Sequence, residues 1–150
     1  MQLFLFSDSW PSHLAHVLAA KVVQVEQTII NFLEEVEAFG NKMNLISLTS
    51  ESQLTTIVND STTVVLFKHS TRCSISNMAW KMFQQEWNNA ETPVYCLDLL
   101  NYRSVSNAIA SQFEIEHQSP QVLVIKNGAC VYHATHQAID AAIVQAALQN

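Results

Sequence analysis

The chain has 150 residues, 49% of them hydrophobic, a length and composition that suit one ordinary domain with a well-filled core. Its formal net charge is −6 and it has no long basic run, which argues against nucleic acid or an anionic membrane as its partner. Three cysteines, an odd number without metal-ligand spacing, fit a reducing compartment better than a disulfide framework. No stretch has the pattern of a signal peptide or the length of a membrane span, so we expect a cytoplasmic, soluble protein.

Residues 1–42 differ in character from the rest of the chain. The stretch 12–39 contains no glycine or proline and is followed by Gly40, which predicts one long helix. Its apolar residues recur at alternating spacings of four and three, as in a heptad repeat: they are Leu18, Val22, Val25, Ile29, Phe32, Val36 and Phe39. We therefore predict an N-terminal helical extension, residues 1–42, in front of a domain formed by residues 43–150.

The role of this extension stays open at the level of sequence. The helix could lie on its own domain as an amphipathic element, or it could pair with a second copy and form a homodimer through residues 12–40. It could also be dispensable, with Met43 as the physiological start. Three glutamates near its end argue against a role at a membrane surface.

From residue 44 onward, predicted strands and helices alternate. Ser50 and Gln53 form a capping box at the start of one helix, and Asn127-Gly128 predicts a tight hairpin turn. The predicted strands are 45–48, 62–68, 93–98, 121–126 and 129–133, and the predicted helices are 50–59, 74–87, 104–113 and 140–148. This βαβαβαββα order is that of the thioredoxin fold, so we expect an α/β, thioredoxin-like domain with an extra N-terminal amphipathic helix.

The predicted helix 74–87 has many apolar residues, which we expect to cluster on one buried side. They are Ile75, Met78, Ala79, Met82, Phe83 and Trp87.

Cys73 lies where the apolar strand 62–68 gives way to a helix. The unpaired backbone N–H groups and the dipole at a helix start favour an anion. Arg72 is adjacent, and Lys68 and His69 lie just upstream, so positive charge is expected beside the sulfur. Because the thiolate is the nucleophilic form of cysteine, we predict that Cys73 is reactive rather than a buried residue of the corner.

Ser76 stands where a dithiol redox enzyme would carry its second cysteine. A lone thiol can attack a disulfide, but it needs a small free thiol or a distant cysteine to complete turnover. Ser76 could instead donate a hydrogen bond to the thiolate. Cys96 lies in an apolar strand and Cys130 in the hairpin, so we predict structural roles for both, while a part in turnover stays open.

Ser119-Pro120 directly precedes the predicted strand 121–126. In thioredoxin-like folds a proline at this place in the element order is cis and abuts the active cysteine, and the residue before it offers its backbone to the bound partner. We therefore predict a cis bond here, with a simple loop-breaking proline as the alternative.

The histidines do not predict a metal site, because no cysteine or carboxylate completes a set at a standard spacing. The sets in question are His117, His133 and His136, and His13 with His16. His133 or His136 could line the pocket of the thiol.

Three separated stretches, FKHSTRCSIS, LDLLNYRSVSNAIA and HQSPQVLVIKNGACVYHATH, resemble the monothiol bacilliredoxins of the YtxJ type, over about residues 43–146. The resemblance implies a thioredoxin fold and a role in bacillithiol chemistry. The cysteine that matches Cys73 would attack a protein–bacillithiol mixed disulfide, free the protein and carry the bacillithiol until free bacillithiol regenerates it. Residues 1–42 have no counterpart in this family.

The implied reaction uses no bound cofactor; bacillithiol or a similar small thiol is a co-substrate, and S-thiolated proteins are the partners. The predicted site consists of the nucleophile Cys73 and of residues that stabilise the thiolate or bind substrate: Arg72, Ser76, His69, Ser119 and Pro120. The alternative is a redox-inactive, thioredoxin-like adaptor that binds partners through its N-terminal helix.

Overall fold

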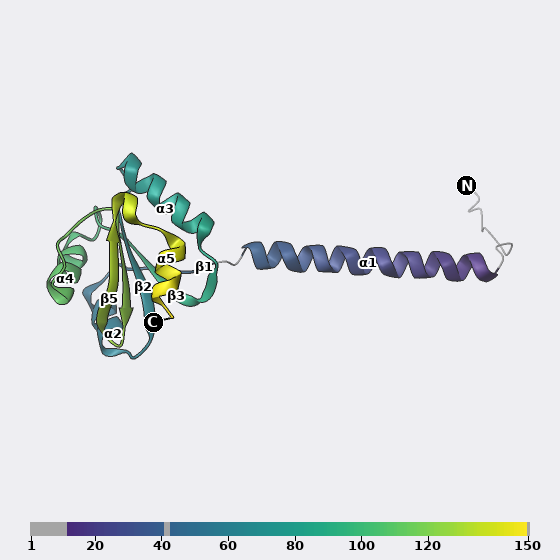
Figure 1. Cartoon of the computed structure of the whole chain (residues 1–150), viewed down its shortest axis with the longest axis horizontal. Helices are drawn as coiled ribbons and strands as arrows, with labels where there is room; N and C mark the ends of the chain where they lie inside the picture. Colours follow the sequence, from purple (N-terminus) through teal and green to yellow (C-terminus); the bar gives the residue numbers. More distant parts are fainter. Residues whose placement is uncertain (1–11, 41–42, 150) are drawn as a thin grey trace, which may run out of the picture. The chain divides into compact units, whose positions relative to one another are not determined.

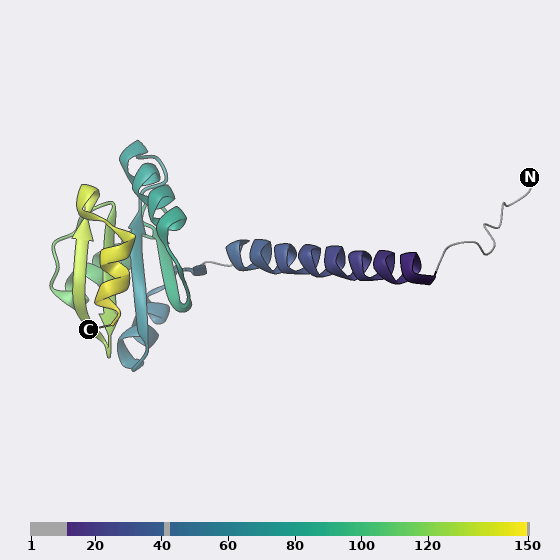
Figure 2. The same cartoon turned by 45° about the vertical axis from the view of Figure 1, so that its right-hand side comes forward.

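The computed structural model describes residues 12–40 and 43–149, and the chain divides after Gly40 into two compact units (Figures 1 and 2). The described part of the first unit is the single helix α1, Ser12–Gly40, as the absence of helix breakers predicts. Its side chains between residues 20 and 33 are all exposed. Among the described residues, neither this 29-residue helix nor any other is long and apolar enough to cross a membrane.

The second unit is a five-stranded sheet covered by helices on both faces, with strand order β1-β3-β2-β4-β5 (Figure 1). Strand β3 runs parallel to β1 and β2, whereas β4 runs antiparallel to β2 and β5. The strands are β1 Met43–Ser47, β2 Thr63–His69, β3 Asn89–Asp98, β4 Gln121–Lys126 and β5 Ala129–Thr135. The helices are α2 Glu51–Asn59, α3 Ser74–Glu86, α4 Arg103–Phe113 and α5 Ala141–Ala147, with a 3-10 turn η1 at His136–Ala138. The predicted βαβαβαββα order is confirmed.

Two local signals act as the sequence predicts. The Ser50 hydroxyl accepts from the Gln53 N–H (3.3 Å), and the Gln53 side chain accepts from the Ser50 N–H (3.2 Å), which caps α2. Asn127 and Gly128 both have positive φ, of 50° and 73°, and join β4 to β5. A Cβ at position 128 would also collide with the carbonyl oxygen of Val58, so this turn requires glycine.

Strand β2 lies at the centre of the sheet, and its side chains alternate between two hydrophobic clusters. Val64 and Leu66 belong to the cluster beneath α2 and α4, whereas Val65 and Phe67 belong to the cluster beneath α3 and α5. Every residue of β2 after Thr63 is buried, as a strand with helices on both sides requires. Each fully buried side chain of this size contributes about 1.5–3 kcal/mol, so β2 anchors the loop that follows it.

Helix α3 departs from the prediction, because its apolar residues do not form one buried side. Phe83 and Trp87 are buried, but Ile75, Met78 and Met82 are 58%, 66% and 51% exposed. The inward stripe is instead Ser76, Trp80, Phe83 and Trp87. The rings of Trp80 and Phe83 pack against Phe67, and the ring of Trp87 packs against Phe83. These large rings fill the space between α3 and the sheet, so the smaller apolar residues are left on the outer side.

Candidate active site

Cys73 is the N-cap residue of α3 and is partly exposed. Its backbone N–H donates to the Ser70 carbonyl (3.1 Å), and its carbonyl accepts from the Asn77 N–H (2.9 Å). Its backbone is extended, with φ −98° and ψ 120°, and its side chain makes no capping hydrogen bond. The sulfur therefore stands at the start of a 13-residue helix without being used to hold that helix together. Arg72, the neighbouring predicted site residue, is exposed.

Ser76 lies directly beneath this loop and is fully buried. Its Oγ accepts from the Ser70 N–H (2.9 Å) and lies 2.9 Å from His69 Nδ1. A serine hydroxyl has a single proton to donate. When Nδ1 is unprotonated, that proton goes to His69; when Nδ1 carries a proton and donates, the serine proton is free. The contacts of the Ser76 hydroxyl are with His69 and Ser70, and its donation to the Cys73 thiolate stays a prediction.

His69 ends strand β2 on the α3 face, buried and packed beside the Trp80 ring. Burial lowers the pKa of His69, an effect that the Asp98 carboxylate and a backbone hydrogen bond with Ser76 oppose only in part. The imidazole is thus neutral at neutral pH. His69 belongs to the site as a neutral hydrogen-bonding group, rather than as the cation that the sequence predicted.

Lys68 lies on the opposite face of the sheet, because successive side chains of a strand point to opposite sides. It is fully buried, and its Nζ lies 2.9 Å from His117 Nδ1, which is also 3.2 Å from the Ser106 hydroxyl. Burial, with a smaller effect of Arg103, lowers the pKa of Lys68 to about 8. The prediction that Lys68 acts with Cys73 is therefore wrong, since its ammonium group contacts a cluster on the α4 side.

Asp98, which sequence reasoning missed, holds the loop before Cys73. Its Oδ2 accepts from the Thr71 hydroxyl (3.3 Å) and from Asn101 Nδ2 (2.8 Å). The Asn77 amide donates to the Thr71 carbonyl (3.3 Å) from the other side. Asp98 ends β3 opposite His69 in the parallel pairing. Since carboxyl ends of parallel strands meet at one edge, an acidic residue just after an apolar strand was a signal that could have placed it there.

The Ser119–Pro120 peptide is cis, as its place in the element order predicts. The Pro120 carbonyl accepts from the His136 N–H (3.0 Å), which ties this loop to the start of η1. The Ser119 hydroxyl oxygen is buried and finds no hydrogen-bond partner within the part of the chain that the structure describes. This loop thus joins the proline to a histidine that faces α3.

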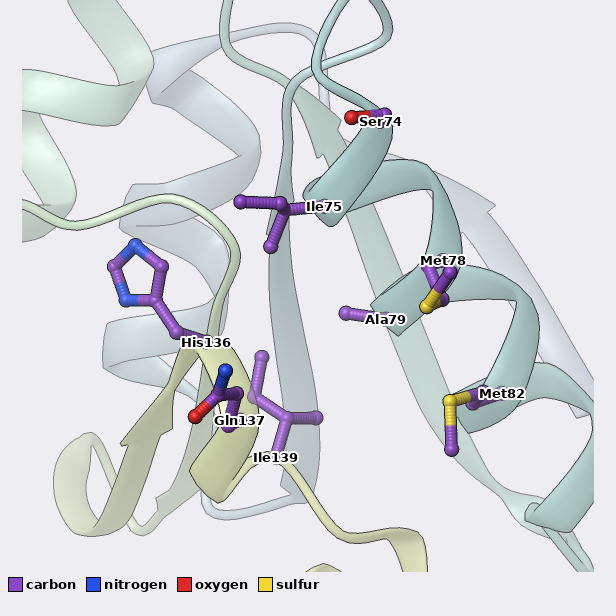
Figure 3. Close-up of a pocket in the computed structure, with 8 residues that line it drawn as sticks. All are labelled: Ser74, Ile75, Met78, Ala79, Met82, His136, Gln137 and Ile139. Carbon is purple, nitrogen blue, oxygen red and sulfur yellow. The ribbon is translucent and has the colours of Figure 1, made fainter.

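An apolar groove of about 430 Å³ begins at Ser74, the residue after Cys73 (Figure 3). Side chains of α3 form one wall and residues of the η1 segment form the other, facing them: the lining residues are Ser74, Ile75, Met78, Ala79, Met82, His136, Gln137 and Ile139. The exposed apolar residues of α3, Ile75, Met78 and Met82, are among the residues that line this groove. Methionine side chains adapt their shape, so the groove suits varied apolar groups.

His136 therefore lines the groove that begins at the residue after Cys73, whereas His133 lines a different hollow, together with Cys130. Within residues 12–40 and 43–149, no three His, Cys, Asp or Glu side chains gather closely enough to hold a metal ion.

The other two cysteines are free thiols in protected surroundings. Burial, aided by the Asp98 charge, raises the pKa of Cys96 to about 11. Burial also raises the pKa of Cys130, whose Sγ lies 3.2 Å from the Tyr132 carbonyl oxygen. Neither sulfur is ionised at neutral pH, which is the behaviour of structural cysteines.

A protein-family model described as monothiol bacilliredoxin BrxC matches residues 46–144, which include Cys73, Ser76 and Pro120. The chain belongs to the monothiol bacilliredoxin family. The matched stretch covers the whole sheet apart from the first residues of β1, and it leaves out α1.

Solved structures agree on the fold of this bacilliredoxin. A protein described as a candidate oxidoreductase with a thioredoxin fold is 28% identical with a TM-score of 0.64, covering 70% of this chain and 94% of that one. Thioredoxin of Malassezia sympodialis is 16% identical with a TM-score of 0.56, covering 71% and 92%. Thioredoxin of Plasmodium falciparum is 17% identical with a TM-score of 0.54, covering 69% and 96%. The two thioredoxins support the fold alone, and the family together with the first structure supports a redox enzyme acting on thiols.

Proposed function

We propose that this bacilliredoxin is a monothiol oxidoreductase that removes bacillithiol, or another small thiol, from mixed disulfides on protein cysteines. The observation that carries the proposal is the pair Cys73 and Ser76: a partly exposed thiol at a helix start, with a buried hydroxyl where a resolving thiol would stand. The resemblance to the YtxJ type favours bacillithiol, and we expect the protein to work in a cytoplasm that contains this thiol.

In the first step, the Cys73 thiolate attacks the small-thiol sulfur of the mixed disulfide. A new disulfide forms between Cys73 and the small thiol, and the protein cysteine leaves as a thiolate. In the second step, a free small thiolate attacks this disulfide, which releases the symmetrical small-thiol disulfide and regenerates the Cys73 thiolate. One disulfide is broken and one is formed in each step, so the electrons come from the free small thiol.

The surroundings of Cys73 support this sequence of events. The loop is held by Asp98 and Asn77, so the sulfur keeps its position at the start of α3. Cys96 and Cys130 have raised pKa values, which favours an outside thiol, rather than a second cysteine of the chain, for the second step. The groove beside Ser74 supplies an apolar surface on which the client protein can rest while exchange takes place.

Stoichiometry tests the proposal. Reduced enzyme is mixed with an excess of a protein that carries bacillithiol on one cysteine, with and without free bacillithiol, and the released client thiol is counted. We expect about one client thiol per enzyme without free bacillithiol, and continued turnover with it. Release of free bacillithiol together with the client thiol, leaving an internal disulfide in the enzyme in place of the adduct, would show that a second cysteine of the chain resolves the intermediate. No release under either condition would contradict the proposal and favour an adaptor.

A further inference from the structure

We propose that helix α1 joins two copies of the chain in a parallel, two-stranded coiled coil. This inference is independent of the reaction at Cys73. It rests on the apolar stripe that α1 exposes between Val22 and Phe32 and on the charges that border that stripe.

The stripe follows a heptad repeat with β-branched residues at one of its two seam positions. With Val22 at position a, the a positions are Val22, Ile29 and Val36, and the d positions are Leu18, Val25, Phe32 and Phe39. Val or Ile at position a favours two parallel strands when position d is leucine, as it is at Leu18. The stripe runs from Leu18 to Phe39, about three heptads, which is the shortest length over which such a repeat indicates a coiled coil.

The described seam residues are not covered within their own unit. Val22, Val25, Ile29 and Phe32 are between 52% and 63% exposed. An isolated helix has little stability in water, and most helical stability in proteins comes from packing an apolar face. A second copy of the same stripe supplies the matching surface.

The charges beside the seam are compatible with the parallel orientation. Lys21 occupies a g position and Glu26 the following e position, and both side chains are exposed. In a parallel, in-register pair, each g residue faces the e residue five positions later on the partner, so Lys21 of each copy meets Glu26 of the other. In a fully overlapping antiparallel pair, e positions face e positions and g positions face g positions. This would set Glu26 against Glu26 but Lys21 beside Glu35, so the charge-reversal experiment below decides the orientation. The other e and g positions from 19 to 33 are Ala19, Thr28 and Leu33, which carry no charge.

The apolar surface extends past the seam to Val23 and Ile30, which are 62% and 47% exposed at position b. A third strand could cover this additional surface, so a trimer is the main competing assembly. The test below separates it from the dimer.

Charge reversal in the full-length chain tests both partner number and orientation. Sedimentation equilibrium over a range of concentrations is compared for the wild type, Lys21→Glu, Glu26→Lys and the double variant. Each single variant replaces two attractive pairs by two repulsive ones, and should raise the dimer dissociation constant about tenfold. The double variant restores opposite charges in a parallel pair and should return to the wild-type value. Lys81→Glu, the same charge change on the exposed surface of α3, serves as the control and should leave the dissociation constant unchanged.

Any one of three results would contradict the proposal. A wild-type chain that is monomeric at 100 micromolar would exclude pairing through α1, and a trimer would exclude the two-stranded form. A double variant that stays as weak as the single ones would exclude the parallel register. Circular dichroism of all variants verifies that helix content is retained, so a change in assembly is not caused by unfolding. Val25→Asp, which places a charge in the seam itself, should abolish association and provides an independent check.

Discussion

Two polar clusters lie at the same end of the sheet, on its two opposite faces. On the α3 face, His69 contacts Ser76 beneath the loop that carries Cys73. On the α4 face, Lys68 and Ser106 both contact His117. Each cluster pairs a basic residue of β2 with a buried serine in the first turn of a helix. Only the first cluster lies under the loop that carries Cys73.

The difference shows how adjacency in sequence misleads within a strand. Lys68 and His69 are neighbours in the chain, but the alternation of β2 sends one to each face. The α3-face cluster fixes the loop that carries Cys73, because Ser76 also accepts from the Ser70 N–H. The α4-face cluster buries an ammonium group whose hydrogen-bond partner is an imidazole. We therefore assign reactivity to the first cluster and a pH-dependent contribution to stability to the second.

Replacing the buried serine of each cluster should give the largest difference in exchange rate between the two clusters. Ser76→Ala leaves His69 Nδ1 and the Ser70 N–H without their partner, and should reduce the free energy of unfolding by about 1–3 kcal/mol and the exchange rate of Cys73 by about tenfold. Ser106→Ala is the matched control on the other face; it should cost stability but leave the exchange rate unchanged. Urea unfolding and reaction with a small disulfide measure the two quantities. An equal loss of exchange rate in both variants would contradict the assignment.

Lys68→Met should remove a dependence of stability on pH. The folded pKa of Lys68, about 8, lies below its ordinary value of 10.5, so the unfolded chain binds more protons between these pH values. The contribution of Lys68 to the free energy of unfolding therefore rises as the pH rises from about 8 to 10.5. The variant should lack this rise and be at least as stable as the wild type at pH 7, because a buried charge is replaced by an apolar group of similar length.

Urea unfolding of both proteins at pH 7, 8.5 and 10 measures the difference that Lys68 makes. Comparison of the two proteins is needed because the raised pKa of Cys96, about 11, acts in the opposite direction above pH 9. If the two proteins respond to pH in parallel, the pKa of Lys68 is not depressed in the folded chain.

A substitution in the groove should have the smallest effect on activity, and that effect should be restricted to protein substrates. Met78→Ala removes an exposed side chain from the groove wall, and should raise KM for an S-thiolated protein by a few-fold. The rate with a small mixed disulfide should stay the same, because that substrate does not reach along α3. Gln84→Ala, on the same helix but outside the groove, is the control. A loss with both substrates would show that Met78 supports the loop of Cys73 instead of contacting clients.

Much of this arrangement could be predicted from the sequence, because its signals are local or topological. The order of strands and helices placed Cys73 at the start of α3 and Pro120 before β4, and the structure has both there, with the proline cis. The capping box of Ser50 and the turn at Gly128 need only neighbouring residues, and both form as predicted.

What the sequence did not reveal depends on competition between side chains in space. Helix α3 has two apolar stripes, and periodicity alone could not show that the rings of Trp80, Phe83 and Trp87 would displace Met78 and Met82 from the core. The contact of Lys68 with His117 joins positions 49 residues apart, which no local pattern reports. The role of Asp98 needed the pairing of β2 with β3 in addition to its own position.

The most direct test of the central claim is the mass of the intact protein after treatment of the reduced chain with oxidised bacillithiol. We predict one bacillithiol adduct on the wild type, mapped to the peptide that contains Cys73 and absent from Cys73→Ser. Cys96→Ser and Cys130→Ser should still take up one adduct, because neither sulfur is ionised at neutral pH. An unmodified wild type, or an adduct that persists in Cys73→Ser, would contradict the account.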